Sequence, residues 1–271
     1  MSDGTVSVER VDQVALVTLR RPDKRNALNE AMWRGLAAAA QKLREQAPRA
    51  VVVTGEGSAF CAGMDLSAEN PQLAGLAQAA QTRDPGPMRE LLTQLRPAID
   101  AFIALPVPTI AAVNGLAYGG GAELATRCDL RVVDPDAEIC FSEVRLGLIP
   151  DMGGCATLPR LVGRAVATDL IVTARRVKSA EALSLGLANR VSAPGKVVEE
   201  ALALGRSIAQ NGPRAVRAAL DVIRRGADLT EDEALALERD RATEVMATGE
   251  CIFGVTAVMA HQDPEFPDID D

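Results

Sequence analysis

Three consecutive glycines, Gly119-Gly120-Gly121, stand between a short apolar segment (residues 109–113) and a segment of helical character (residues 120–127). Glycine loses more conformational freedom on folding than any other residue, so three in a row need a physical reason. One reason is a ligand that contacts main-chain N–H groups at the first turn of a helix. Another is a tight crossing of strand and helix that admits only small residues. Both reasons require a strand, a turn and a helix in this order.

The same order of elements recurs through the first two thirds of the chain. Segment 50–53 is entirely apolar, and segment 109–113 is apolar after Thr109, which is typical of strands buried on both faces. Asn29 is a candidate helix N-cap, because apolar residues follow it at helical spacing. This alternation predicts an α/β fold with parallel strands joined by crossovers. Further strands are expected at 5–10 and 14–19, as a β-hairpin, and at 130–133 and 137–141.

The other segments complete a single domain. We predict a loop at 55–66, a polar and mobile stretch at 67–87, and a helix at 88–105 that stops before Pro106. No repeat or low-complexity linker divides the chain, so a core at 1–195 and a helical extension at 196–271 are expected to form one structural unit. The later helices are predicted at 157–174, 180–186, 195–211, 213–226, 230–248 and 251–261.

Composition excludes several classes of function. The net charge of −8 disfavours nucleic acid and anionic membranes as partners. The start of the chain lacks the features of a secretory signal, and the apolar stretch 102–125 is interrupted by prolines, Asn114 and glycines, so no membrane span is expected. Five scattered cysteines without a Cys-x-x-Cys pair indicate reduced, buried thiols and a cytoplasmic protein.

A single histidine, His261, makes a multi-histidine metal site impossible and Ser-His-Asp catalysis a poor expectation. We predict no metal site, and acid–base chemistry then falls to carboxylates, lysines or Tyr118. Glu123, three residues after Gly120, and Glu143, after segment 137–141, are the candidates. Each could instead be a surface residue or pair with Arg127 or Arg145.

Four segments in order resemble the crotonase superfamily, and enoyl-CoA hydratases most closely. They are residues 21–29 (RPDKRNALN), 59–66 (AFCAGMDL), 114–123 (NGLAYGGGAE) and 143–154 (EVRLGLIPDMGG). The likeness extends over about residues 6–266. It implies the crotonase (ClpP-like) fold of repeated ββα units, with two roughly perpendicular sheets and a helical C-terminal region. It also implies a homotrimer or a hexamer made of two trimers.

The resemblance implies an acyl-CoA thioester as substrate and no cofactor beyond the coenzyme A that the substrate carries. The backbone N–H groups of Met64 and Gly120 match the family's oxyanion hole, and Glu123 and Glu143 match its catalytic pair. The implied activity is that of a hydro-lyase of fatty acid metabolism, which adds water reversibly to a trans-2-enoyl-CoA and gives a 3-hydroxyacyl-CoA. Other positions that match substrate-contacting segments are Lys24, Arg25, Ala27, Ala62, Asp65, Leu66 and Gly119.

Asp151 departs from the hydratase pattern, which often has glycine there. An acid at this position resembles dienoyl-CoA isomerases, and the run Pro150-Asp151-Met152-Gly153-Gly154 resembles carnitinyl-CoA-type dehydratases. Asp151 could therefore act with Glu143 in a different reaction, or serve only as a helix N-cap. The chain also lacks the basic C-terminal stretch of the family, which leaves Lys24 and Arg25 as candidates for the CoA phosphates. A non-catalytic acyl-CoA- or RNA-binding protein is the remaining alternative.

Overall fold

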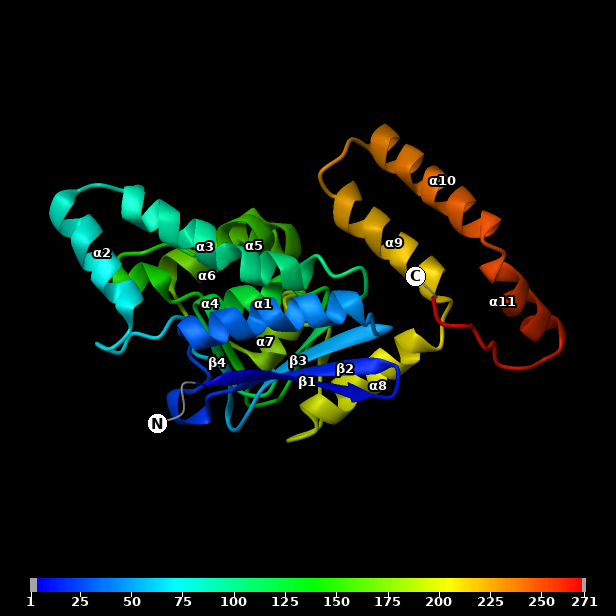
Figure 1. The fold of residues 1–271 in the computed structure, drawn as a ribbon, viewed down its shortest axis with the longest axis horizontal. Coiled ribbons are helices and arrows are strands. Elements are labelled where there is room, and N and C mark those ends of the chain that lie inside the picture. Colours follow the sequence, from blue (N-terminus) through cyan, green and yellow to red (C-terminus); the bar gives the residue numbers. More distant parts are fainter. Residues whose placement is uncertain (1–3, 270–271) are drawn as a thin grey trace.

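The computed structural model describes residues 4–269 and contains two β-sheets with helices around them (Figure 1). In the larger sheet, the first two strands form an antiparallel hairpin, and every later strand is parallel to its neighbour. This confirms the predicted hairpin and the parallel crossovers. Its strands, in spatial order, are β1 (Thr5–Val11), β2 (Val14–Arg20), β3 (Ala50–Gly55), β5 (Thr109–Val113), β7 (Leu130–Val133) and β10 (Arg190–Val191).

The smaller sheet has four short strands, and its first three are parallel. They are β4 (Ala59–Cys61), β6 (Leu116–Tyr118), β8 (Glu138–Cys140) and β9 (Val177–Lys178). The pairs β3–β4, β5–β6 and β7–β8 each contribute one strand to each sheet, which is the repeated unit that the resemblance implies. The prediction of a loop at 55–66 is wrong for residues 59–61, because three-residue strands leave almost no periodic pattern.

Helices cover both faces of the larger sheet. Helix α1 (Glu30–Glu45) starts at Asn29, whose side chain accepts a hydrogen bond from Met32 N, as its sequence predicts. Alternate residues of β3 pack on opposite faces, with Val51 and Val53 in the main core and Ala50 and Val52 against α8 (Val197–Ala209). A strand covered on both sides is mostly apolar, as β3 and β5 are apart from Thr54 and Thr109.

Two helix predictions need correction. Residues 67–87 include helix α2 (Pro71–Thr82) and the start of α3 (Gly86–Ile103). Pro71 stands at the first turn of α2, where a missing N–H costs nothing, and Asn70 caps the helix. The predicted helix at 157–174 is two helices, α5 (Gly154–Val162) and α6 (Arg164–Thr173), with Gly163 at φ 78° between them. The shorter elements are η1 (Pro22–Lys24), α4 (Gly120–Arg127), η2 (Glu143–Leu146) and α7 (Ser179–Ser184).

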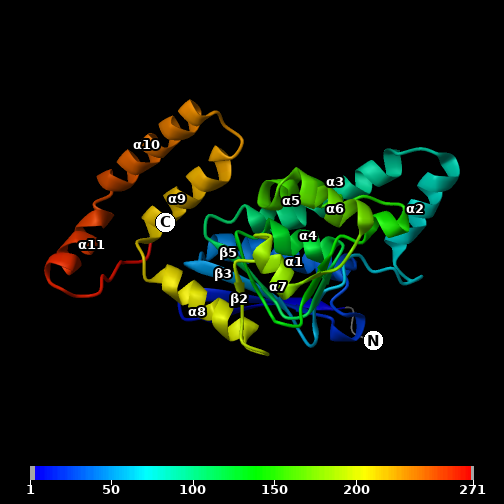
Figure 2. The same ribbon diagram turned by 180° about the vertical axis from the view of Figure 1, so that it is seen from behind.

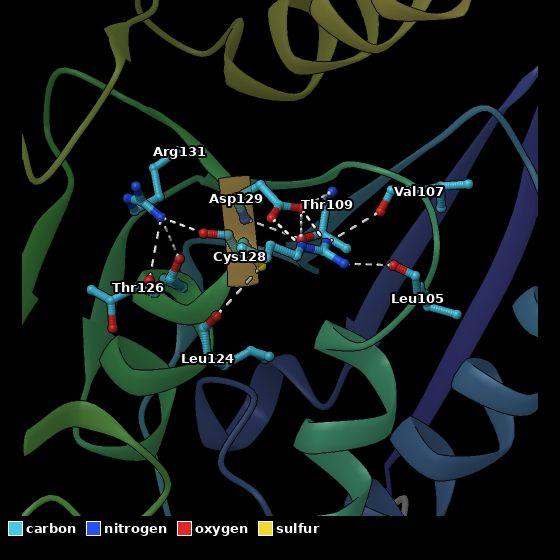
Figure 3. Close-up of polar contacts among 10 residues, drawn as sticks. Leu105, Val107, Thr109, Leu124, Thr126, Cys128, Asp129 and Arg131 are labelled. Carbon is cyan, nitrogen blue, oxygen red and sulfur yellow. Dashed lines mark hydrogen bonds and ion pairs between the residues drawn. The ribbon is translucent and has the colours of Figure 1, made fainter. Parts of the chain in front are cut away.

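The last three helices form an arm that extends away from the sheets, at the opposite end of the molecule from α2 (Figures 1 and 2). They are α9 (Pro213–Gly226), α10 (Glu231–Ala247) and α11 (Glu250–Met259). Arg224 of α9 attaches the arm to the core: it bonds to both carboxylate oxygens of Asp129, at 2.8 and 2.6 Å, and to Leu105 O at 2.8 Å. Figure 3 shows Asp129 beside Thr109, Leu105 and Val107 at this junction.

The chain end after the arm returns to the core. Arg49 binds Phe266 O at 2.6 Å and Asp268 at 2.9 Å, so the segment before residue 269 lies against the start of β3. Residues 1–3 and 270–271, which belong to the predicted core and extension, lie outside the described residues. Within residues 4–269, no single helix has the length and apolarity of a membrane span. The pair α10–α11 meets those two criteria only when joined across a 73° bend.

Candidate active site

The predicted site residues follow the strands of the smaller sheet. Met64 comes three residues after β4, Gly120 two residues after β6, and Glu143 three residues after β8. Because β4, β6 and β8 are parallel neighbours, their carboxyl ends meet at one edge of that sheet. Ligand sites of α/β proteins commonly form at such an edge. Three repeats therefore bring three groups together that lie far apart in the sequence.

The turns after β4 and β6 touch each other. A Cβ atom on Gly63, which has φ 84°, would lie 2.7 Å from Tyr118 O and 3.1 Å from Gly120 N. The segment around Met64 is held by a bridge to Leu28, with Leu28 N donating to Gly63 O and Asp65 N to Leu28 O. Met64 N and Gly120 N have no hydrogen-bond acceptor within residues 4–269, and both residues are half-buried. Two adjacent free N–H donors are the geometry of an oxyanion hole.

Glu123 lies in the first turn of α4 and is 1% exposed, which excludes the surface role. Its Oε1 accepts hydrogen bonds from Met152 N at 2.9 Å and Gly154 N at 2.7 Å. Burial raises the pKa of Glu123, and the charges of Glu143 and Asp151 raise it further, while the two N–H donors oppose this only in part. No ion pair joins Glu123 to Arg127, which instead contacts Asp100.

Glu143 is also buried, at 8% exposed, and neither carboxylate oxygen has a hydrogen-bond partner in the described residues. Its carboxyl group lies beside the glycine run, because a Cβ on Gly119 would be 3.5 Å from Glu143 Oε1. Burial raises the pKa of Glu143, and the nearby Asp151 adds to the effect. The predicted alternative of an ion pair with Arg145 is wrong, because Arg145 is exposed and the Glu143 oxygens are unpaired.

The two glutamates lie close enough for the charge of Glu143 to raise the pKa of Glu123. Glu123 accepts two N–H bonds that stabilise its charged form, whereas Glu143 accepts none. These bonds do not outweigh burial, which raises the pKa of Glu123 to about 8, so the pair holds at least one proton at neutral pH. A buried carboxylate and a buried carboxylic acid side by side can act as base and acid in one reaction.

Asp151 lies near both glutamates but is exposed. It is not a helix N-cap, since α5 begins at Gly154 after Gly153, and that alternative is wrong. Partial loss of solvent raises its pKa. With Met88, Leu92 and Asp100 of α3 it lines a groove of about 600 Å³, which is large enough for an acyl chain.

A second cavity, of about 480 Å³, lies beside the Met64 turn. Lys24 lines it with Arg21 and Arg34, and Asp65 forms part of the wall. The Asp65 carboxylate is already bound within the protein, because it pairs with Arg21 at 2.7 Å and accepts a hydrogen bond from Ser67 N. Burial tends to raise the pKa of Asp65, but these contacts outweigh it and lower the pKa.

The remaining predicted contact residues are scattered around these two turns. Ala27 is buried and Gly119 is fixed by a bond from its N–H to Cys140 O, whereas Arg25 and Leu66 are exposed. Ala62 is half-buried and donates its N–H to Arg25 O. Arg25 lines neither cavity.

Sequence reasoning missed the residues that hold Glu123. The amides of Met152 and Gly154 do so, and the glycine pair Gly153-Gly154 is the signal that could have revealed a close main-chain approach. The cysteine prediction also needs correction, because Cys155 and Cys251 are exposed. Among residues 4–269, no group of three or more histidine, cysteine or acidic residues is arranged to hold a metal ion.

Comparison with known proteins places this geometry in context. The family model for enoyl-CoA hydratase/isomerase matches residues 9–268. A protein of Rhizobium meliloti described as a "probable enoyl-CoA hydratase" is 37% identical over 98% of this chain and 99% of its own length. A short-chain-enoyl-CoA hydratase of Clostridium acetobutylicum is 34% identical over 92% of both chains. The crystal structure of an enoyl-CoA hydratase from Bacillus anthracis superposes with a TM-score of 0.87 and 32% identity, covering 97% of this chain and 98% of that one.

Proposed function

Because this chain belongs to the enoyl-CoA hydratase/isomerase family, we propose that it is a hydro-lyase that adds water to a trans-2-enoyl-CoA and gives the 3-hydroxyacyl-CoA. The observation that carries the proposal is the pair of buried glutamates beside two free main-chain N–H groups. A thioester bound with its carbonyl oxygen at Met64 N and Gly120 N is activated toward water, because negative charge develops on that oxygen in the transition state. Removing one such donor costs about 3–4 kcal/mol in comparable enzymes.

The two glutamates divide the proton transfers. In the reactive form of the pair the proton lies on Glu143, and the charged Glu123, held by Met152 N and Gly154 N, takes a proton from the attacking water. Glu143, protonated and free of other partners, gives a proton to Cα of the enolate. Dehydration exchanges the roles. The reaction conserves oxidation state and balances with water alone, so the proposal invokes no cofactor besides the coenzyme A of the substrate.

The CoA moiety is proposed to occupy the cavity beside Met64. Lys24, one of the two candidates from the sequence, supplies exposed positive charge there, and Arg34, which pairs with Glu30, supplies a second exposed cation. Arg25, the other candidate, lies outside this cavity, so Arg34 is the better second partner for a phosphate. The acyl chain then extends toward Asp151 and the groove along α3.

Hydration of a panel of trans-2-enoyl-CoAs tests the function. Wild-type protein is expected to consume the 2-enoyl thioester, Glu143→Gln to lose at least a hundredfold in kcat, and Asp151→Asn to keep most of it. No turnover by wild-type protein that still binds acyl-CoA would contradict the hydratase proposal.

Asp151 favours a second candidate, a double-bond isomerase or carnitinyl-type dehydratase that uses Glu143 and Asp151. Its proximity to both glutamates and its raised pKa support a proton-transfer role. Deuterium exchange from solvent into a dienoyl-CoA, abolished in Asp151→Asn, would favour this reaction over hydration.

We further propose a homotrimer, alone or paired into a hexamer, assembled through the C-terminal arm. The support is an apolar surface on α10 and α11 that the described residues leave uncovered; its members are Leu235, Met246, Ile252, Val255, Val258 and Met259. A soluble chain seldom leaves so many neighbouring apolar side chains in water. A second copy of the same chain is the proposed occupant, with the site operating in the cytoplasm.

A further inference from the structure

We propose that Arg127 is a positioning residue that fixes Glu123 for proton transfer by clamping the turn at residues 150–154. The inference rests on the proposed function only in so far as Glu123 is the base. Glu123 and Arg127 are four residues apart in α4, so both side chains point to the same side of the helix. That side faces the turn.

The turn is held from two directions by these two residues. Its N–H groups at Met152 and Gly154 donate to Glu123 Oε1, at 2.9 and 2.7 Å. Its carbonyl at Met152 accepts from Arg127 Nη1 at 3.0 Å. No other donor within residues 4–269 reaches Met152 O. The distance between the carboxylate and its two donors is therefore fixed by a guanidinium group one helical turn away.

The turn needs such a clamp because its own backbone is soft. Gly153 has φ 115°, a conformation that side chains rarely adopt, and Gly154 follows directly. Two consecutive glycines resist displacement poorly. The stem of Arg127 fills the space beside them, since a Cβ on Gly153 would lie 2.7 Å from Arg127 Cδ.

Asp100 forms an ion pair with the guanidinium, without a hydrogen bond. Its Oδ1 lies 2.7 Å from Arg127 Nη1, and it projects from α3, which forms the groove that Asp151 also lines. The Asp100 side chain is 42% exposed, so solvent screens the pair and its loss matters less than the loss of the bond to Met152 O. Arg127 thus links the groove wall, the turn and the base.

Removing the clamp should change the pKa of Glu123 in a definite direction. The two N–H bonds favour the ionised carboxylate, so loosening them raises the pKa of Glu123. In Arg127→Met we expect the acidic limb of the kcat–pH profile to move to higher pH and kcat to fall between about ten- and a hundredfold, as for other small misplacements of a catalytic group. KM should change little, because Arg127 lines neither the 480 Å³ cavity nor the groove.

Three further variants sharpen the experiment. Arg127→Lys keeps the charge but has a single nitrogen, so it should recover part of kcat and shift the profile less. Asp100→Asn should have a smaller effect than Arg127→Met. Arg160→Met removes an exposed arginine of α5 that pairs with Asp228; it is the matched control and should leave the profile unchanged.

A readout independent of turnover separates this inference from the proposed function. The carboxylic C=O band of Glu123 in pH-difference infrared spectra, identified by its loss in Glu123→Gln, should titrate at higher pH in Arg127→Met than in wild-type protein. Identical titration midpoints would overturn the inference, even for a protein that hydrates enoyl-CoAs. A shifted midpoint in a protein without hydratase activity would support the clamp and refute the hydratase. If Arg127→Met does not fold, Arg127→Lys supplies the comparison.

Discussion

The three glycines at 119–121 lie in three different backbone environments. Gly119 adopts φ 51° and ψ −126°, a backbone conformation that other residues avoid. Gly121 packs against the β4 backbone, and a Cβ there would lie 2.2 Å from Cys61 O. A Cβ on Gly120 would have its nearest neighbours at 3.8 Å, in ordinary contact. The packing explanation and the ligand explanation of this run thus apply to different positions.

Alanine substitutions distinguish these positions. Gly121→Ala should lower the free energy of unfolding by about 1–3 kcal/mol or more, because the clash is with main chain that cannot rotate away. Gly120→Ala should change it by less than about 1 kcal/mol. Urea unfolding of both variants measures the difference, and equal midpoints would show that Gly121 is not a packing requirement.

The buried glutamates give stability a pH dependence opposite to that of most carboxylates. Their raised pKa values mean that the folded state binds protons which the unfolded state has already released above about pH 4.3. Stability should therefore fall as pH rises from there until the pair is ionised in the folded protein, by up to about 1.4 kcal/mol per pH unit for each proton. Glu123→Gln should flatten this slope in unfolding experiments from pH 5 to 8. An unchanged slope would show that the pKa of Glu123 is not raised in the folded protein.

At the scale of elements, one carboxylate joins two helices of the arm. Glu250, buried at the start of α11, accepts hydrogen bonds from Arg214 N and Ala215 N at the start of α9. Its charge also complements the positive end of the α9 dipole.

Glu250→Ala should speed amide exchange at residues 214–216 and lower the free energy of unfolding by about 1–2 kcal/mol, as for the loss of a strong helix cap. Thr230→Ala removes the exposed capping box of α10 and serves as the control, with faster exchange confined to residues 231–234. Unchanged exchange at 214–216 in Glu250→Ala would show that α9 does not depend on this cap.

Elements with strong local signals were predictable from the sequence, and those without were not. Helix α1 follows from Asn29 and the apolar spacing behind it, and β3 from its unbroken apolar run. Helix α2 was missed because Pro71 can end a helix or begin one, and only its position after Asn70 distinguishes the two. Strands β4 and β6 have three residues each, and their pairing is decided by tertiary contacts.

The site, like the fold, was predictable from the sequence only in part. The positions of Glu123 and Glu143 make them acid–base candidates, but their role as a pair and the pairing of Met64 with Gly120 follow only from the resemblance to a known family. Nothing in the spacing of residues 127 and 152 indicates that Arg127 binds Met152 O, because that contact depends on how α4 faces the turn. Long-range polar contacts made by main-chain atoms leave no signature in residue type.

For the whole molecule, the apolar surface of the arm predicts a dependence on assembly. Adding charge at Ile252 and Val258, which are 65% and 70% exposed, should dissociate an oligomer without unfolding the chain. Light scattering after gel filtration should give a trimer or hexamer for wild-type protein and a monomer for Ile252→Asp/Val258→Asp. Ala38→Asp, on the exposed side of α1, adds the same kind of charge and should leave the mass unchanged. A wild-type monomer would refute the proposed assembly.

The groups that meet after β4, β6 and β8 are of two kinds: main-chain N–H groups and side-chain carboxyl groups. The first two repeats contribute backbone amides, which any sequence supplies as long as the turns keep their shape. Glu123, Glu143 and Asp151 instead are side chains, so a single codon changes each one. Related proteins with this architecture can keep the main-chain N–H groups that bind a thioester while the proton-donating side chains around them change. A different reaction therefore requires no new fold, only different acidic side chains beside the same two N–H groups.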